Sequence, residues 1–87
     1  MNLEEYLVVF SGHNISTYLY QRLVIRSLYV ELVPTPAKIH YGCSLAVKFR
    51  ANDMSIVLEE IRKMNTAPKG IFKIIKDGKQ LFYEKVN

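Results

Sequence analysis

Short apolar runs alternate along the chain with two segments whose apolar residues recur at helical spacing. The runs predict five strands, at residues 6–10, 29–33, 43–50, 71–75 and 80–84. Between the first two runs, Ile15, Leu19 and Leu23 recur every four residues, which predicts an amphipathic helix over residues 15–28. A second helix is predicted after residue 53 by the apolar stripe of Met54, Val57, Leu58, Ile61 and Met64.

Polar turn residues separate these elements. Ser11-Gly12-His13-Asn14 follows the first strand, and its serine or asparagine is expected to cap the first helix. Asn52 or Asp53 is expected to cap the second helix in the same way. Asp77-Gly78 predicts a two-residue hairpin turn between the last two strands.

The order β-α-β-β-α-β with one further strand predicts a ferredoxin-like α+β sandwich. Right-handed crossovers place both helices on one face of an antiparallel sheet. The hairpin adds the fifth strand beside the fourth, so the expected strand order is 5-4-1-3-2. With 87 residues, the chain is expected to form a single domain around one core.

Composition narrows the class of protein. A hydrophobic fraction of 49% is too high for a disordered chain. The longest apolar run, residues 6–10, is far shorter than the roughly 20 residues of a membrane span. The amino terminus lacks the positive start of a signal peptide, and a lone cysteine agrees with a reducing compartment. We therefore expect a cytoplasmic protein without a membrane partner, a metal site or a cofactor.

The net charge of +4 comes with an uneven distribution of acids. No acidic residue lies between Glu5 and Glu31, or between Glu31 and Asp53. The basic residues in these gaps are Arg22, Arg26, Lys38, Lys48 and Arg50. They form either a solvated surface or a positive field for an anion or an acidic partner. Nucleic acid is not favoured, because no RNP-type aromatic motif or basic tail accompanies the charge.

The single cysteine, Cys43, carries the candidate chemistry. Pro34 and Pro36 cannot donate ladder hydrogen bonds, so the second strand is expected to stop there, and Gly42 gives the backbone freedom before the thiol. In the predicted topology, the third strand begins beside the end of the first. Cys43 should then lie near Ser11-Gly12-His13 and the first helix amino terminus, on the helix-covered face.

A helix amino terminus and a nearby imidazolium at His13 would both favour thiolate over thiol. Ser11, Gly12, Gly42 and Ser44 are then candidates for an anion or thiolate pocket. The alternative is that Cys43 is a small buried hydrophobe and that His13 is only a polar turn residue. His40, in the proline loop, is expected to be exposed to solvent. An enzyme is not favoured, because no base and orienting group complete a triad with Cys43.

The sequence resembles the Putative Se/S carrier protein-like family of small bacterial and archaeal domains. The matching segments are residues 6–13, residues 30–36 and residues 42–49, together with the helix after residue 53. The resemblance covers about residues 5–64 and leaves the carboxy-terminal hairpin, about 70–85, largely outside. Two residues depart from the family pattern: Ser44 stands where glycine is usual, and Gly12 where threonine is expected.

The resemblance implies that Cys43 carries selenium or sulfur, as a selenosulfide or persulfide, between partner proteins. A desulfurase-type donor and an acceptor protein would then be the partners. The competing interpretation is a non-catalytic ferredoxin-like module that binds a small anion or a protein, or forms a homodimer, with Cys43 as packing. The acidity of the thiol distinguishes the two, because only the carrier needs a thiolate.

Overall fold

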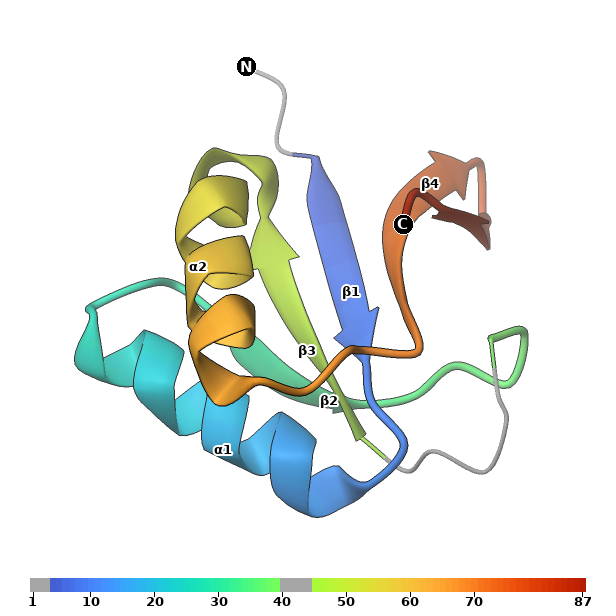
Figure 1. Ribbon diagram of the computed structural model, residues 1–87. Coiled ribbons are helices and arrows are strands. Elements are labelled where there is room, and N and C mark those ends of the chain that lie inside the picture. Colours follow the sequence, from blue (N-terminus) through green and yellow to red (C-terminus); the bar gives the residue numbers. More distant parts are fainter. Residues whose placement is uncertain (1–3, 40–44) are drawn as a thin grey trace.

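The computed structural model describes residues 4–39 and 45–87, which form a five-stranded sheet and two helices (Figure 1). The strands are β1 (Glu5–Val9), β2 (Glu31–Pro34), β3 (Leu45–Arg50), β4 (Gly70–Asp77) and β5 (Gln80–Lys85). The helices are α1 (His13–Ile25) and α2 (Met54–Met64), and a short 3₁₀ turn, η1 (Ala51–Asp53), precedes α2.

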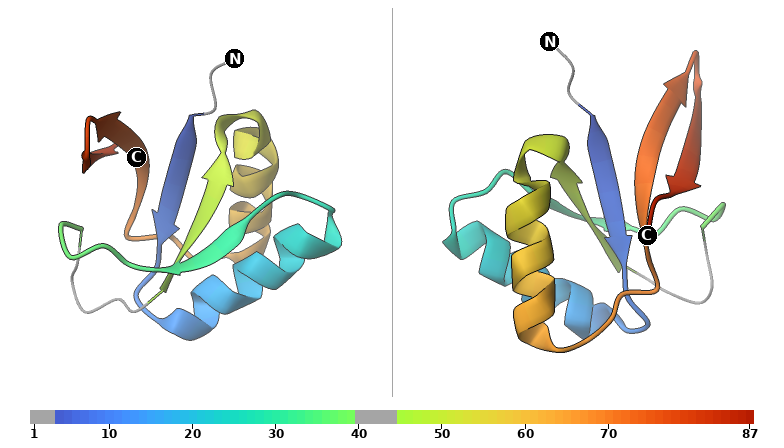
Figure 2. Two further views of the ribbon diagram at one scale, coloured as in Figure 1. Left: turned by 180° about the vertical axis from the view of Figure 1, so that it is seen from behind. Right: turned by 45° about the horizontal axis from the view of Figure 1, so that its top comes forward.

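The sheet order is β2-β3-β1-β4-β5, and every neighbouring pair is antiparallel. This is the predicted order 5-4-1-3-2 read from the other edge, so the predicted α+β topology is confirmed. Figures 1 and 2 show both helices on one side of the sheet. The β4–β5 hairpin projects beyond the part of the sheet that the helices cover (Figure 2).

The main core lies between the sheet and the helices. Its buried residues are Val8, Phe10, Val47, Phe49 and Ile71 from the sheet side, and Leu19, Leu23, Val57 and Ile61 from the helices. The predicted stripe of α1 is therefore confirmed, with Ile15 packed at the border of this core. Along β3, Val47 and Phe49 belong to this core, whereas Ala46 belongs to a second cluster on the opposite face.

The predicted stripe of α2 is wrong at one position. Leu58 is 38% exposed, whereas Glu60 is only 1% exposed. The side of α2 that faces the core is centred on Val57 and Ile61, and Glu60 is buried beside them. Its carboxylate can be buried because Arg22 of α1 and Arg26, just after that helix, bind it.

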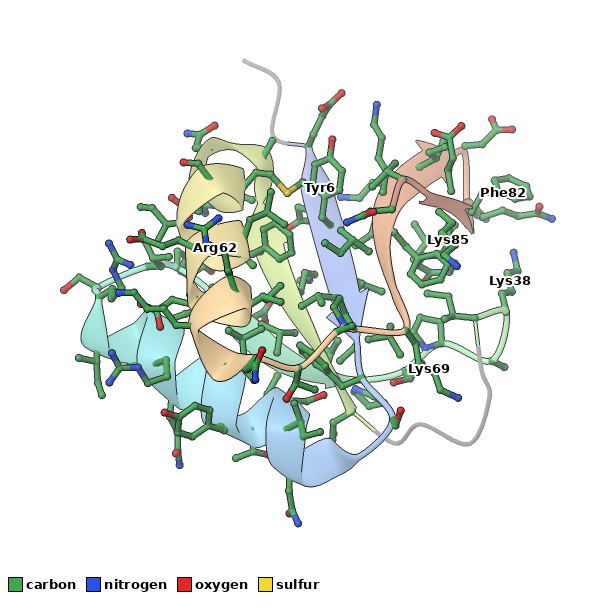
Figure 3. The ribbon with its side chains drawn as sticks, viewed as in Figure 1. Tyr6, Lys38, Arg62, Lys69, Phe82 and Lys85 are labelled. Atoms are coloured by element: carbon green, nitrogen blue, oxygen red, sulfur yellow. The ribbon has the colours of Figure 1, made fainter. Side chains whose placement is uncertain are left out.

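The opposite, helix-free face of the sheet has a smaller cluster of Leu7, Val9, Ile39 and Ala46. Ile39 reaches this cluster from the loop that follows β2. The preceding residue, Lys38, donates a hydrogen bond from Nζ to the Leu81 carbonyl at 2.7 Å. Its ammonium also lies 4.6 Å from the centroid of the Phe82 ring (Figure 3). Through Lys38, the loop after β2 therefore contacts β5, the strand at the opposite edge of the sheet.

The ends of several elements differ from the predictions. The amino-terminal caps of α1 and α2 are Gly12 and Asp53, and neither helix has a side-chain cap hydrogen bond, so the predicted serine or asparagine cap of α1 is wrong. The hairpin loop is Gly78 and Lys79, one residue later than predicted, because Asp77 already pairs with Gln80. Gly78 supplies the positive φ of 63° that such a tight turn requires.

β2 also continues through Pro34, which pairs with Leu45. Proline is tolerated there because β2 is an edge strand.

Candidate functional site

The turn between β1 and α1 brings the chain from the core to the surface at the amino terminus of the helix. Phe10 is buried, and the chain then comes to the surface at Ser11. Gly12, the cap residue, has φ −127° and ψ 149°, which any residue can adopt. Apart from its chain neighbours, no heavy atom of the described residues would lie within 4 Å of a Cβ atom built on Gly12. Among these residues, nothing in the packing therefore requires a glycine at this position.

The first turn of α1 is also electrostatically suited to an anion. It contains no acidic residue, and its cap residue, Gly12, has no side chain that could accept a hydrogen bond from the first N–H groups. Unpaired N–H groups and the aligned peptide dipoles give a helix amino terminus a partial positive charge. His13 is the first residue of this helix. A thiolate or another negatively charged group beside this turn would be stabilised.

Ser16 connects this turn to the third strand. It is fully buried, and its Oγ donates a hydrogen bond of 3.0 Å to the main-chain carbonyl of Leu45. At the same end of the sheet, Val9 pairs with Ala46. Together these contacts place the start of β3 beside the end of β1 and the first turn of α1. The predicted neighbourhood is thus confirmed as far as Leu45.

The predicted site residues that precede β3 lie outside the part of the chain that the structure describes. Cys43 precedes Leu45 by two residues, and it lies outside the described residues together with Gly42, Ser44 and His40. Ser11, Gly12 and His13 are adjacent at the start of α1, as the sequence requires. The approach of the thiol to His13 stays a prediction.

Ser16 itself was not among the predicted residues. The signal for it is a small polar residue at position 16 that continues the buried spacing of Leu19 and Leu23. A serine on such a face has to satisfy its hydroxyl within the protein.

Three of the five basic residues of the acid-free segments, Arg22, Arg26 and Lys48, have carboxylate partners in space. Lys48 binds Glu31 across neighbouring strands at 2.9 Å, and this hydrogen bond raises the pKa of Lys48. Arg50 stacks on Tyr29, with its Cζ 4.1 Å from the ring centroid. Arg22 and Arg26 bind carboxylates on α2. Carboxylates from other parts of the chain therefore neutralise much of the positive charge of the segments that contain no acidic residue.

The cluster on α2 joins the two helices. Glu60 accepts hydrogen bonds from Arg26 Nη1 at 2.9 Å and from Arg22 Nε at 3.4 Å. The contact with Arg26, followed by that with Arg22, holds the pKa of Glu60 below its usual value against the opposing effect of burial. Arg22 lies in the last turn of α1 and Arg26 is the carboxy-terminal cap residue of this helix, so both are away from the turn at Gly12. We assign this cluster to stability.

Residues 4–39 and 45–87 show neither a metal site nor a membrane span. No three His, Cys, Asp or Glu side chains gather there in a way that could hold a metal ion. In the same part of the chain, neither helix is long and apolar enough to cross a membrane.

Comparison with known proteins places the chain in a family. No curated protein and no solved structure matches it significantly. The sequence profile of a family described as Putative Se/S carrier protein-like matches residues 5–73. The match begins with β1 and ends within β4, so it includes the β1–α1 turn, Ser16, Cys43 and the start of β3. It leaves β5 outside. The chain belongs to the Putative Se/S carrier protein-like family.

Proposed function

We propose that this domain accepts one sulfur or selenium atom on Cys43 and passes it to a second protein. The observation that carries the proposal is the family match, because it spans the only thiol in the chain. The fold supports it independently. The Ser16–Leu45 hydrogen bond holds the start of β3 against an uncapped helix amino terminus, and Cys43 precedes that point by two residues.

The transfer is an exchange between thiols. The Cys43 thiolate attacks the outer sulfur of a persulfide on the donor, forming a new sulfur–sulfur bond as the donor's own bond breaks. The donor leaves as a thiolate, and the terminal atom with its proton stays on Cys43. Selenium follows the same course through a selenosulfide. A nucleophile on the acceptor then takes the terminal atom, which regenerates the Cys43 thiolate.

The amino-terminal turn of α1 has a clear role in this scheme. Both the attacking thiolate and the ionised terminal atom are anions, and the uncapped N–H groups of the turn favour negative charge. In the proposal, His13 as an imidazolium adds to this field. The proposal assigns Ser11, Gly12, Gly42 and Ser44 to the pocket for this anion. The donor is of the desulfurase type, and the scheme requires no cofactor and no nucleic acid.

The acidity of Cys43 tests the role of the turn. We expect the rate of alkylation of the native chain to rise with a midpoint below about 8.5, the pKa of an ordinary thiol. His13→Ala should move the midpoint upward, because a positive neighbour is lost. His40→Ala is the matched control, and it should leave the midpoint unchanged. A wild-type midpoint at or above the ordinary value would favour a binding module in which Cys43 only packs.

The transfer itself is tested by mass spectrometry of the intact chain. After incubation with a cysteine desulfurase and cysteine or selenocysteine, the chain should gain one sulfur or one selenium. Peptide mapping should locate it on Cys43, and Cys43→Ser should gain none. The urea-unfolded chain is the control for nonspecific persulfidation, and it should load more slowly than the folded one. Equal loading of both would show an unselective thiol and would contradict the carrier function.

A further inference from the structure

The helix-free face of the sheet is hollowed into a cavity of about 250 Å³. Its apolar lining includes Leu7, Val33 and Ile74, which come from β1, β2 and β4. Leu81 and Tyr83 of β5 contribute a further wall, and the cavity is bordered by Pro34, at the end of β2, and Pro36, in the loop that follows. This volume is near the lower limit for small-molecule pockets in proteins, so it suits a short ligand.

A second, more open cavity of about 520 Å³ adjoins the first. The two share Pro36, Leu81 and Tyr83 as lining residues. The open cavity adds Lys38 and Lys79, one on the loop and the other in the β4–β5 turn. We call the two cavities together the hairpin groove. It has an apolar inner part and a mouth flanked by two lysines.

The charges of the hairpin groove are unbalanced at its mouth. Lys48 and Lys76, which line the inner cavity, each have a carboxylate partner, Glu31 and Glu5 respectively. Within the part of the chain that the structure describes, neither Lys38 nor Lys79 forms an ion pair. Lys38 donates to a main-chain carbonyl and contacts an aromatic ring (Figure 3), which leaves its positive charge unneutralised. An anion at the mouth would complement both lysines.

The groove depends on the carboxy-terminal hairpin. Lys79, Leu81 and Tyr83 all lie beyond residue 73, where the family match ends. The Lys38–Leu81 hydrogen bond holds the loop after β2 against the same hairpin. The groove is therefore built from parts of the chain that the family match does not fully include. A second copy of the chain is a poor occupant, because a symmetric contact would bring the same lysines together.

We propose that the hairpin groove binds a small organic anion. A carboxylate or phosphate of the ligand lies between Lys38 and Lys79, and a short apolar body enters the cavity over Leu7 and Ile74. This function goes beyond chalcogen transfer and does not depend on Cys43.

Hexanoate is the probe, because it combines one carboxylate with a short alkyl chain. In an NMR titration of the whole chain, hexanoate should shift the amide signals of Ala37, Lys38 and residues 79–83. Hexyl phosphate in a parallel titration distinguishes a preference for phosphate from one for carboxylate. Hexanol and hexylammonium, of the same length, should bind at least about tenfold more weakly, because they lack the negative charge. Inorganic phosphate, which lacks the apolar body, should also be weaker.

Substitutions then locate the site. Lys79→Ala should weaken hexanoate binding about tenfold with little effect on folding, because Lys79 lies in an exposed turn. Arg62→Ala is the matched control. It removes the same charge from α2, which lies away from the groove (Figure 3), and it should leave the affinity unchanged. Leu81→Glu should abolish binding by placing a carboxylate against the two lysines.

Any of four results would overturn the proposal. The first is equal binding of hexanol and hexanoate, the second is shifts confined to other residues, and the third is equal effects of Lys79→Ala and Arg62→Ala. Binding of inorganic phosphate as tight as that of hexanoate would also overturn it, because the apolar cavity would then play no part.

Discussion

Replacing Ile61 by alanine should lower the free energy of unfolding by about 2–4 kcal/mol, whereas Leu58→Ala should lower it by less than about 1 kcal/mol. Both residues belong to the apolar stripe of α2. Ile61 is 7% exposed and packs in the main core, while Leu58 is 38% exposed. Truncation of Ile61 removes apolar contacts and leaves a cavity beneath the helix. Truncation at position 58 leaves mainly solvent-exposed space.

Urea denaturation of the two variants measures this difference, provided that the slope of the transition is unchanged. Intrinsic helix propensity acts against the expected order, because alanine is a better helix former than isoleucine and only slightly better than leucine. A larger loss for Ile61→Ala therefore has to come from packing. Equal losses would mean that α2 buries its whole apolar stripe, as the sequence pattern alone suggests.

The sheet order was predictable because the connections between the strands allow few alternative orders. Two helical connections and one tight hairpin determine which strands are neighbours once right-handed crossovers are assumed. The alternation of Val47 and Phe49 with Ala46 then determined which face of β3 meets the helices. These features follow from local periodicity and chain connectivity, both of which are properties of the sequence.

The buried position of Glu60 was not predictable from periodicity. A prediction from an apolar stripe treats hydrophobic residues as buried. It therefore places Leu58 in the core and a glutamate at the surface. The actual choice depends on Arg22 and Arg26, which are distant in sequence and reach Glu60 only when α1 and α2 pack side by side. The same reasoning applies to Ser16, whose partner is the carbonyl of Leu45, 29 residues away.

The strand neighbourhood of the candidate site was predictable for a topological reason, whereas the position of Cys43 within it stays a prediction. Antiparallel pairing of β1 and β3 brings the start of one beside the end of the other, and the structure shows this arrangement as far as Leu45. The hairpin groove could not be inferred in this way. It depends on the bond from Lys38 to the edge of β5, and no local pattern encodes a contact between a loop and a strand edge 43 residues apart.

Glu60→Gln should lower the free energy of unfolding at neutral pH by about 2 kcal/mol. The substitution keeps the shape of the side chain and removes the charge that Arg26 and Arg22 bind. Glu59→Gln is the matched control. Glu59 also binds Arg26, at 3.1 Å, but it is partly exposed, so its loss should cost less than about 0.5 kcal/mol.

The effect of Glu60→Gln should also disappear in acid. The pKa of Glu60 is lowered in the folded protein, chiefly by Arg26, whereas an unfolded glutamate titrates near 4.3. Its contribution to stability is therefore complete above about pH 4.3 and is lost as the pH falls through the lower, folded-state pKa. Urea denaturation at pH 7 and at pH 3 should show the gap between wild type and variant closing at the lower pH. A gap of the same size at both pH values would show that the glutamine disturbs packing, and that the buried charge does not hold α1 against α2.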